Sequence, residues 1–299
     1  MAENLLDLPA LLPSWELAMR AERKATGTIK TYGDGVKAFL RWCATTGITP
    51  ELTKVNAQAF VADILDRGAE AATAHGRLKG LRLFSAWLAA EGELDVDQLA
   101  GMRSPRIDHK VVNALTEDQL KRLIKACAGQ GLTDRRDEAL VRLMMETGAR
   151  AAEVVGLQTS DVDLARSQVI IRRGKGGKGR VVYIGPQTGI AIDRYLRARR
   201  SHRLADTGPL WVGGGGKTFG YHGLDGALKA RARAAGIEGF HAHLLRHTFA
   251  TRWKAARGSD DGLMAVAGWS SRAMIDRYAG AAAEQRAADE ARSLGLGDL

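Results

Sequence analysis

Six side chains in the second half of the chain could together do chemistry on an anionic group. They are two arginines, a lysine, a histidine, a tryptophan and a tyrosine: Arg150, Lys175, His243, Arg246, Trp269 and Tyr278. Planar guanidinium groups hold anionic oxygens through paired hydrogen bonds, imidazole exchanges protons near neutral pH, and a phenol must lose a proton of pKa about 10 before it is a strong nucleophile. Such a set suits reactions at a phosphodiester, where negative charge builds up on the nonbridging oxygens.

The spacing of these residues places them at the ends of predicted elements. The segment 147–153 (TGARAAE) lies where one helix ends at a glycine and another begins. His243 and Arg246 lie at positions i and i+3 of the helix that they open, so they share a face. Lys175 lies at the glycine-rich tip of a predicted hairpin. Each residue alone has an ordinary structural explanation, and only the joint pattern indicates function.

The positive charge of the chain is unevenly distributed. The formal net charge is +10, which favours a polyanionic partner but does not distinguish a nucleic acid from an anionic membrane. Residues 1–107 contain 13 Lys and Arg and 13 Asp and Glu, so the whole excess lies in residues 108–299. The C-terminal part is therefore the better candidate for contacts with phosphates.

Residues 10–100 are predicted to form an all-helical domain. Apolar residues recur at helical spacing in three segments, 28–42, 55–65 and 71–90. Glycines follow these segments, as expected at helix ends: Gly47, Gly68 and Gly92. The basic, proline-containing segment 101–110 is typical of a linker. We therefore expect a helical domain over residues 1–100, a linker over 101–113 and a second domain over 114–299.

The second domain is predicted to be mixed, mostly helical with a small antiparallel sheet. Thr116 and Gln119 match a capping box, which predicts a helix from Glu117. Two β-branched segments, 168–172 (QVIIR) and 180–184 (RVVYI), flank the sequence GKGGKG and predict a hairpin. Helical patterns fill much of the remainder: 135–146, 188–199, 224–235, 244–254 and the tail 281–293.

Four strings in the second domain together resemble the tyrosine recombinase family, which includes the phage integrases and the Xer recombinases. They are TGARAAEVVGL, GKGGKGRVV, HLLRHTFAT and GWSSRAMIDRY, in this order. The resemblance is weak over residues 10–100 and strong over residues 116–280. It implies a core-type DNA-binding domain followed by a catalytic domain, without a separate arm-binding domain. The chain has Met274 and Ile275 where the family often has threonine, which we attribute to packing.

The resemblance implies a role for each residue of the set. Arg150 and Arg246 resemble the two arginines that hold the scissile phosphate, and Tyr278 resembles the nucleophile. His243 then accepts or relays the proton of the phenol, and Lys175 gives a proton to the departing 5′ oxygen. Trp269, which stands where many members have histidine and some have tryptophan, completes the catalytic set. Glu153 supports the set, and we expect it to orient a catalytic group.

The resemblance also implies partners and conditions. The substrate is double-stranded DNA, four protomers form the synapse, and an accessory directionality factor is left unidentified. A tyrosine–phosphate bond conserves the energy of the phosphodiester, so we expect no ATP, cofactor or metal. The two cysteines imply no disulfide framework, and we expect a cytoplasmic protein without a membrane partner. The tail from Ala281 to Leu299 is expected to pack on a neighbouring protomer.

Three alternatives stay open on the sequence alone. A type IB topoisomerase-like enzyme would share the tyrosine chemistry without exchanging strands between sites. A DNA-binding protein of the same fold could have lost catalysis, although an idle site has no physical reason to keep this set of residues. A protein of the membrane surface is disfavoured because the sequence contains no basic amphipathic helix with a broad apolar face.

Overall fold

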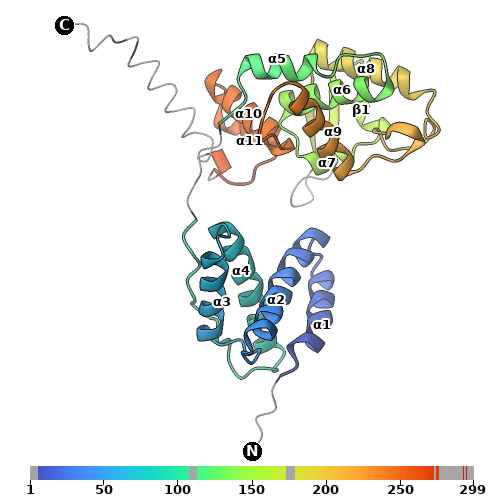
Figure 1. Cartoon of the computed structure of the whole chain (residues 1–299). Helices are drawn as coiled ribbons and strands as arrows, with labels where there is room; N and C mark the ends of the chain where they lie inside the picture. Colours follow the sequence, from blue (N-terminus) through green and yellow to red (C-terminus); the bar gives the residue numbers. More distant parts are fainter. Residues whose placement is uncertain are drawn as a thin grey trace, which may run out of the picture. The chain divides into compact units, whose positions relative to one another are not determined.

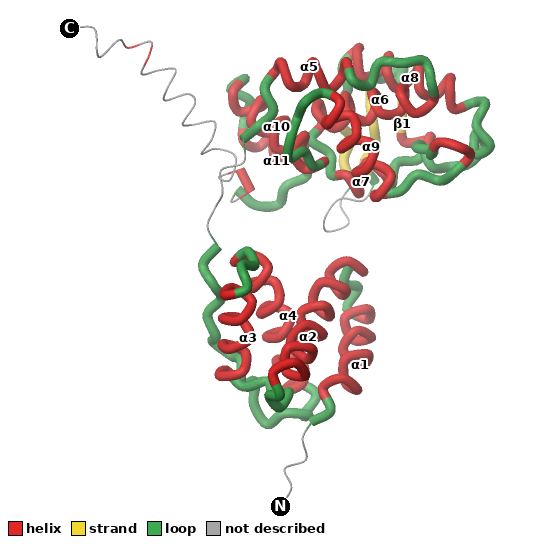
Figure 2. Tube along the Cα trace, viewed as in Figure 1, coloured by secondary structure: helices red, strands yellow, loops and turns green. Residues whose placement is uncertain are grey.

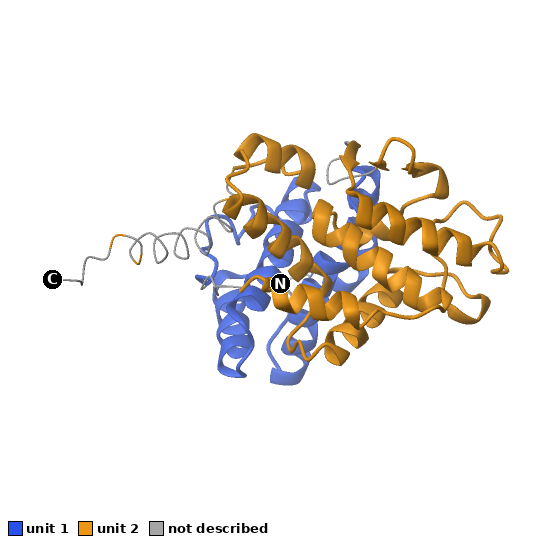
Figure 3. Cartoon of the chain, turned by 90° about the horizontal axis from the view of Figure 1, so that it is seen from above, with its two compact units in different colours: residues 1–110 blue, residues 111–299 orange. Residues whose placement is uncertain are grey.

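The computed structural model describes residues 6–107, 113–172, 179–272, 274–275, 292 and 294. The chain divides into two compact units, Met1–Lys110 and Val111–Leu299 (Figure 3). Helices dominate both units, and the strands of the described residues all lie in the second (Figure 2). The predicted fold class, mainly helical with one small antiparallel sheet, is confirmed. No helix in the described ranges is both long enough and apolar enough to cross a lipid bilayer.

The described residues of unit 1 form four helices (Figure 1). They are α1 (Leu8–Ala21), α2 (Thr26–Thr46), α3 (Lys54–Asp66) and α4 (Ala71–Ala90). The glycines predicted to end helices take positive φ angles, as Gly47 does at 72° directly after α2. Aromatic rings fill the core, where Phe39 and Phe60 meet edge to face with ring centroids 5.5 Å apart.

Two glycines allow α2 and α4 to pack with their backbones in contact. A Cβ atom on Gly80 of α4 would lie 2.6 Å from the carbonyl oxygen of Tyr32 on α2. A Cβ atom on Gly35 of α2 would lie 2.9 Å from the carbonyl oxygen of Arg77 on α4. Because neither position has room for a larger side chain, the crossing of these two helices depends on both glycines.

In the described residues of unit 2, helices accompany a three-stranded antiparallel sheet (Figure 1). One face of the sheet packs on the core through Val169, Ile171 and Val182. The strands are β1 (Val162–Asp163), β2 (Gln168–Ile171) and β3 (Arg180–Tyr183). The helices are α5 (Glu117–Lys125), α6 (Leu132–Thr147), α7 (Ala151–Val155), α8 (Pro186–Arg199), α9 (Tyr221–Ala234), α10 (Ala242–Ala255) and α11 (Asp260–Ala267), with 3₁₀ turns η1 (Thr159–Asp161) and η2 (Gly214–Gly216). The predicted hairpin is confirmed by the pairing of Ile171 with Arg180. The predicted tail helix lies almost wholly outside the described residues.

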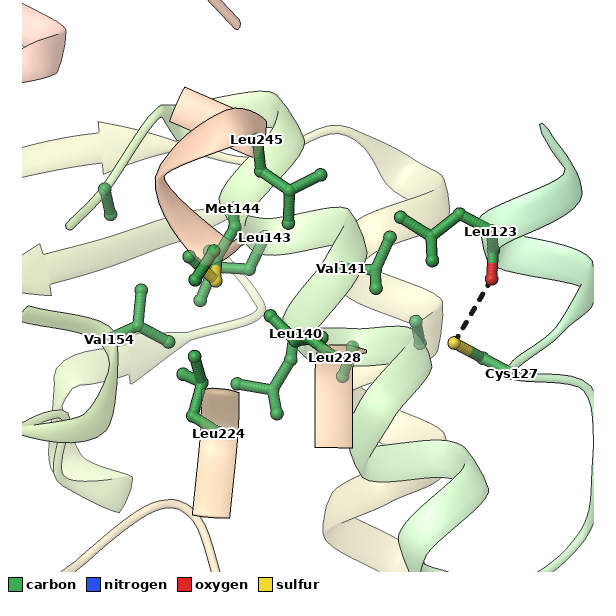
Figure 4. Packing of buried hydrophobic residues seen from close by; sticks show 14 of the residues in the cluster. Leu123, Cys127, Leu140, Val141, Leu143, Met144, Val154, Leu224, Leu228 and Leu245 are labelled. Carbon is green, nitrogen blue, oxygen red and sulfur yellow. Dashed lines mark hydrogen bonds between the residues drawn. The ribbon is translucent and has the colours of Figure 1, made fainter. Parts of the chain in front are cut away.

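Helix α6 lies at the centre of the core of unit 2. Its residues Leu140, Val141, Leu143 and Met144 are buried and pack with side chains from α7, α9 and α10 (Figure 4). The predicted capping box at the start of α5 is confirmed, because the Thr116 hydroxyl and the Gln119 amide each accept a backbone N–H of the other residue. The packing holds the C-terminal half of α6 against α7, α9 and α10.

Each unit contains one buried free cysteine. Cys43 lies in α2 and Cys127 follows α5, and their residues are 2% and 1% exposed. The thiol of Cys127 donates to the carbonyl oxygen of Leu123 over 3.4 Å (Figure 4). Burial, reinforced by the negative charge of Asp137, raises the pKa of the Cys127 thiol to about 12. Burial also raises the pKa of Cys43.

Candidate active site

The turn between α6 and α7 positions Arg150. Helix α6 ends at Gly148, whose φ of 60° is readily adopted by glycine alone, and a Cβ atom there would lie 2.3 Å from Cδ1 of Phe249. Arg150 then precedes the first residue of α7, and its backbone N–H donates to the carboxylate of Glu153 over 2.9 Å. The predicted boundary of two helices at this segment is confirmed, and it places the Arg150 side chain at a helix start.

A buried carboxylate at Glu153 holds two arginines. The Glu153 side chain is 4% exposed and accepts from Nη1 of Arg150 over 2.8 Å and from Nη2 of Arg180 over 2.8 Å. Burial alone would raise the pKa of Glu153, but the hydrogen bonds from Arg180 and Arg150 hold its pKa below the ordinary value. Glu153 is therefore ionised at neutral pH and pairs with Arg150, and the supporting role expected for it stays a prediction.

Arg246 reaches from α10 to the end of α6. The residue is 1% exposed, and its Nη1 donates to the carbonyl oxygen of Gly148 over 2.6 Å. Its guanidinium carbon also lies 5.2 Å from the ring centroid of Trp269, which is within the range of a cation–π contact. The structure thus brings Arg246, Trp269 and the turn before Arg150 together from three distant segments.

Helix α11 supplies the other side of this cluster. It ends at Gly268, whose φ is 63°, and the carbonyl oxygen of Gly268 accepts from Nη2 of Arg150 over 3.3 Å. Trp269 follows directly and is 6% exposed in a small core with Phe249 and Ile275. The interpretation of Ile275 as a packing residue is confirmed by its burial, since it is 3% exposed.

His243 lies near both arginines at the start of α10. Although the residue is exposed, partial desolvation and then the positive charge of Arg246 lower the pKa of His243 below 6.5. His241, whose ring centroid lies 6.5 Å from that of His243, and Arg150 lower the pKa further. The imidazole is therefore neutral at physiological pH, which is the form that accepts a proton.

Lys175 and Tyr278 fall at positions 173–178 and 276–291, outside the described residues. Their predicted roles therefore stay predictions. The other members of the predicted set, together with Glu153, are brought together by the described part of unit 2.

Sequence reasoning missed Arg180 as a member of the site. Its side chain is 10% exposed and lies against Glu153 and α11. The alternation of side chains along 180–184 could have indicated that Arg180 points inward. Arg180, Val182 and Ile184 lie on the same face, and the two apolar residues are buried. A charged residue at the first inward position of a strand requires a buried partner.

Comparison with known proteins agrees with this architecture. The model of the phage integrase family matches residues 113–285. Tyrosine recombinase XerD of Bifidobacterium longum (strain NCC 2705) is 30% identical over 240 residues, which cover 76% of this chain and 78% of that protein. The crystal structure of XerA recombinase is 25% identical, with a TM-score of 0.53 and coverage of 94% of this chain and 98% of that chain.

A further structure, a lambda integrase tetramer bound to a Holliday junction, shares the fold. Its TM-score is 0.68 at 18% identity, with coverage of 90% of this chain and 79% of that chain. The family model and the XerD relative identify an enzyme of DNA strand breakage and rejoining. The chain belongs to the phage integrase family of tyrosine recombinases, and it is a site-specific recombinase.

Proposed function

We propose that this recombinase cleaves duplex DNA through a covalent bond between Tyr278 and a 3′ phosphate. The observation that supports this most strongly is the convergence of two arginines on the same cluster. Arg150 donates to the carbonyl oxygen of Gly268, and Arg246 donates to that of Gly148 while it lies against Trp269. A phosphate bound between two fixed guanidinium groups has its developing charge stabilised without reorganisation of the site.

The proposed step conserves atoms and charge. The phenol oxygen of Tyr278 forms a bond to phosphorus, and the bond from phosphorus to the 5′ oxygen breaks. His243, neutral because its pKa is lowered, accepts the phenol proton. Lys175 gives a proton to the departing 5′ oxygen. The reverse reaction with the 5′ hydroxyl of another strand releases Tyr278 and completes an exchange, so neither ATP nor a metal ion takes part.

The remaining residues act on these groups rather than on the DNA. Glu153 orients Arg150 through two hydrogen bonds, one to the backbone and one to the guanidinium. Trp269 covers the guanidinium of Arg246, which keeps water from it and limits its motion. We assign catalytic roles to Arg150, Lys175, His243, Arg246 and Tyr278, with Trp269 beside them.

We also propose that residues 1–100 bind the DNA duplex, that residues 101–113 act as a linker, and that residues 114–299 form the catalytic domain. Three basic residues of α4, Arg77, Lys79 and Arg82, are available for contacts with phosphates, although their spacing does not place them all on one face of the helix. The lambda integrase relative is a tetramer on a Holliday junction. By analogy, four protomers of this chain assemble on DNA, with residues 281–299 packed on a neighbour. Because its substrate is DNA, we place this enzyme in the cytoplasm.

Covalent trapping tests the proposal. The chain is expressed in the presence of its native flanking DNA, the sample is denatured, and DNA that stays attached to the wild type but not to Tyr278→Phe is sequenced. A sharp set of attached sites is the expected result, and it gives the target sequence. Attachment over all DNA would favour a topoisomerase-like enzyme. Tight, specific footprints without attachment would mean a binding protein that has lost catalysis.

A further inference from the structure

Arg180 contacts both groups that hold Arg150. Its Nη2 and Nη1 donate to the two carboxylate oxygens of Glu153 over 2.8 and 3.3 Å. Its Nε donates to the carbonyl oxygen of Val266 in α11 over 2.7 Å. The guanidinium also lies against Gly268, where a Cβ atom would be 2.8 Å from Nη1. Arg150 itself is held by Glu153 and by the carbonyl oxygen of Gly268.

The placement of Arg180 suits support rather than contact with DNA. All three of its guanidinium nitrogens donate to protein oxygens, and its side chain is 10% exposed. The Arg150 side chain is 26% exposed, so it is the more accessible member of the pair. A single carboxylate shared between two guanidinium groups leaves one positive charge in excess.

We propose that Arg180 is a positioning residue for Arg150. It fixes Glu153 and the end of α11, and it draws part of the carboxylate charge to itself. Arg150 is thereby held in one orientation without being fully neutralised, and it stays able to bind an oxygen of the scissile phosphate. This inference rests on the proposed role of Arg150 in the function above.

Arg180→Gln and Arg180→Lys separate geometry from charge. Glutamine removes the charge and the planar fork that reaches Glu153 and Val266 together. Lysine keeps the charge but contacts fewer of these oxygens at once. Arg172→Gln is the matched control, because Arg172 directly follows the partner strand β2 and is paired with a different buried carboxylate, Asp161. Arg172 forms an ion pair with Asp161 and donates a hydrogen bond to the hydroxyl of Ser160.

The readout uses two duplexes that carry the cleavage site mapped by covalent trapping. One has an ordinary scissile phosphate, and the other has a methylphosphonate, in which a neutral methyl group replaces one nonbridging oxygen. The second substrate is neutral before the reaction and develops one negative charge fewer in the transition state, so the loss of a positioned guanidinium matters less for it. Single-turnover formation of the covalent complex is measured for each variant, and thermal unfolding identifies any variant that fails to fold.

Arg180→Gln is expected to slow cleavage of the phosphate duplex by about tenfold to a hundredfold, the cost of a slightly misplaced catalytic group. On the methylphosphonate duplex, the rate of Arg180→Gln should be closer to the wild-type rate, and the same should hold for Arg150→Ala. The cleavage rate of Arg180→Lys should lie between those of Arg180→Gln and the wild type. Arg172→Gln should change both rates by the same factor. Equal slowing of both duplexes by Arg180→Gln and Arg180→Lys, with Arg150→Ala behaving as expected, overturns the inference. Equal slowing by Arg150→Ala instead rejects the proposed role of Arg150.

Discussion

The guanidinium of Arg246 lies 2.6 Å from the carbonyl oxygen of Gly148, although 98 residues separate them in the sequence. This contact joins the start of α10 to the end of α6. Phe249, one turn further along α10, packs against the same glycine so closely that a Cβ atom would lie 2.3 Å from Cδ1 of its ring. Gly148 is therefore the point at which the end of α6 meets α10.

Gly148→Ala is expected to destabilise unit 2 by about 2–4 kcal/mol. The alanine would have to adopt a left-handed backbone conformation, and its Cβ atom would clash with the ring of Phe249. Thermal unfolding of the full chain measures this. Gly226→Ala in α9 is the matched control, because Gly226 is exposed and a Cβ atom there would meet nothing within 4 Å. It should stabilise the chain by about 0.5–1 kcal/mol. Similar melting temperatures for the two variants would contradict the conclusion that position 148 requires a glycine.

Arg246→Lys is expected to slow formation of the covalent complex by about a hundredfold to a thousandfold, as the loss of a preorganised donor does. Lysine cannot hold the Gly148 carbonyl, lie flat against Trp269 and bind a phosphate with one planar group. Electrophoretic mobility shifts should show DNA binding within a few-fold of the wild type, since one contact among many is changed. Cleavage close to the wild-type rate would remove Arg246 from the catalytic set.

Glu153→Gln is expected to lower the free energy of unfolding by about 3 kcal/mol at neutral pH, because it leaves two guanidinium groups without their shared carboxylate. The lowered pKa of Glu153 means that its contribution to stability is present above its ordinary pKa of 4.5 and is lost as the pH falls through the folded value. Denaturant unfolding at pH 7 and at pH 4 should therefore show a smaller difference between variant and wild type at the lower pH. A difference independent of pH would mean that packing, not charge, explains the effect.

The pH dependence of cleavage should report His243. Desolvation and the charge of Arg246 lower its pKa, so the base stays neutral, and active, to a pH below 6.5. The second-order rate of covalent complex formation, which reports the free enzyme, should therefore fall at a lower pH than it would with an unperturbed histidine as the base. His241→Asn removes one of the charges that lower the pKa, and the acid limb should then move to higher pH. An acid limb that survives in His243→Gln would belong to another group.

The sequence predicted most elements because local signals and tertiary packing agree. The capping box of Thr116 and Gln119 marks α5, and the β-branched segments mark the hairpin. The short α11 was not predicted as a helix, although Ser259 caps its start and Gly268 ends it, because eight residues give little periodicity. The first helix was not delimited either, and it contains Pro13 within its span.

The candidate site was predictable where residue type and role coincide, and not where a contact spans distant segments. Arg150 and Arg246 could be proposed because the strings that contain them, TGARAAEVVGL and HLLRHTFAT, resemble those of a known family. The sharing of Glu153 between Arg150 and Arg180 could not be inferred, because it depends on how β3 lies against α7 in three dimensions. The hydrogen bond from Arg180 to α11 could not be predicted from the family resemblance either. Its acceptor is a backbone carbonyl oxygen, which every residue has, so the sequence does not indicate it.

The two buried thiols make the native chain a convenient starting point for site-specific labelling. Cys43 and Cys127 are the only cysteines of the sequence, and each is buried with a raised pKa. Alkylating and maleimide reagents need an accessible thiolate, so both native thiols should stay unmodified while the chain is folded. A cysteine introduced at an exposed position would then take up a fluorophore alone, and the two units could be followed by single-molecule fluorescence without first replacing residues of either core.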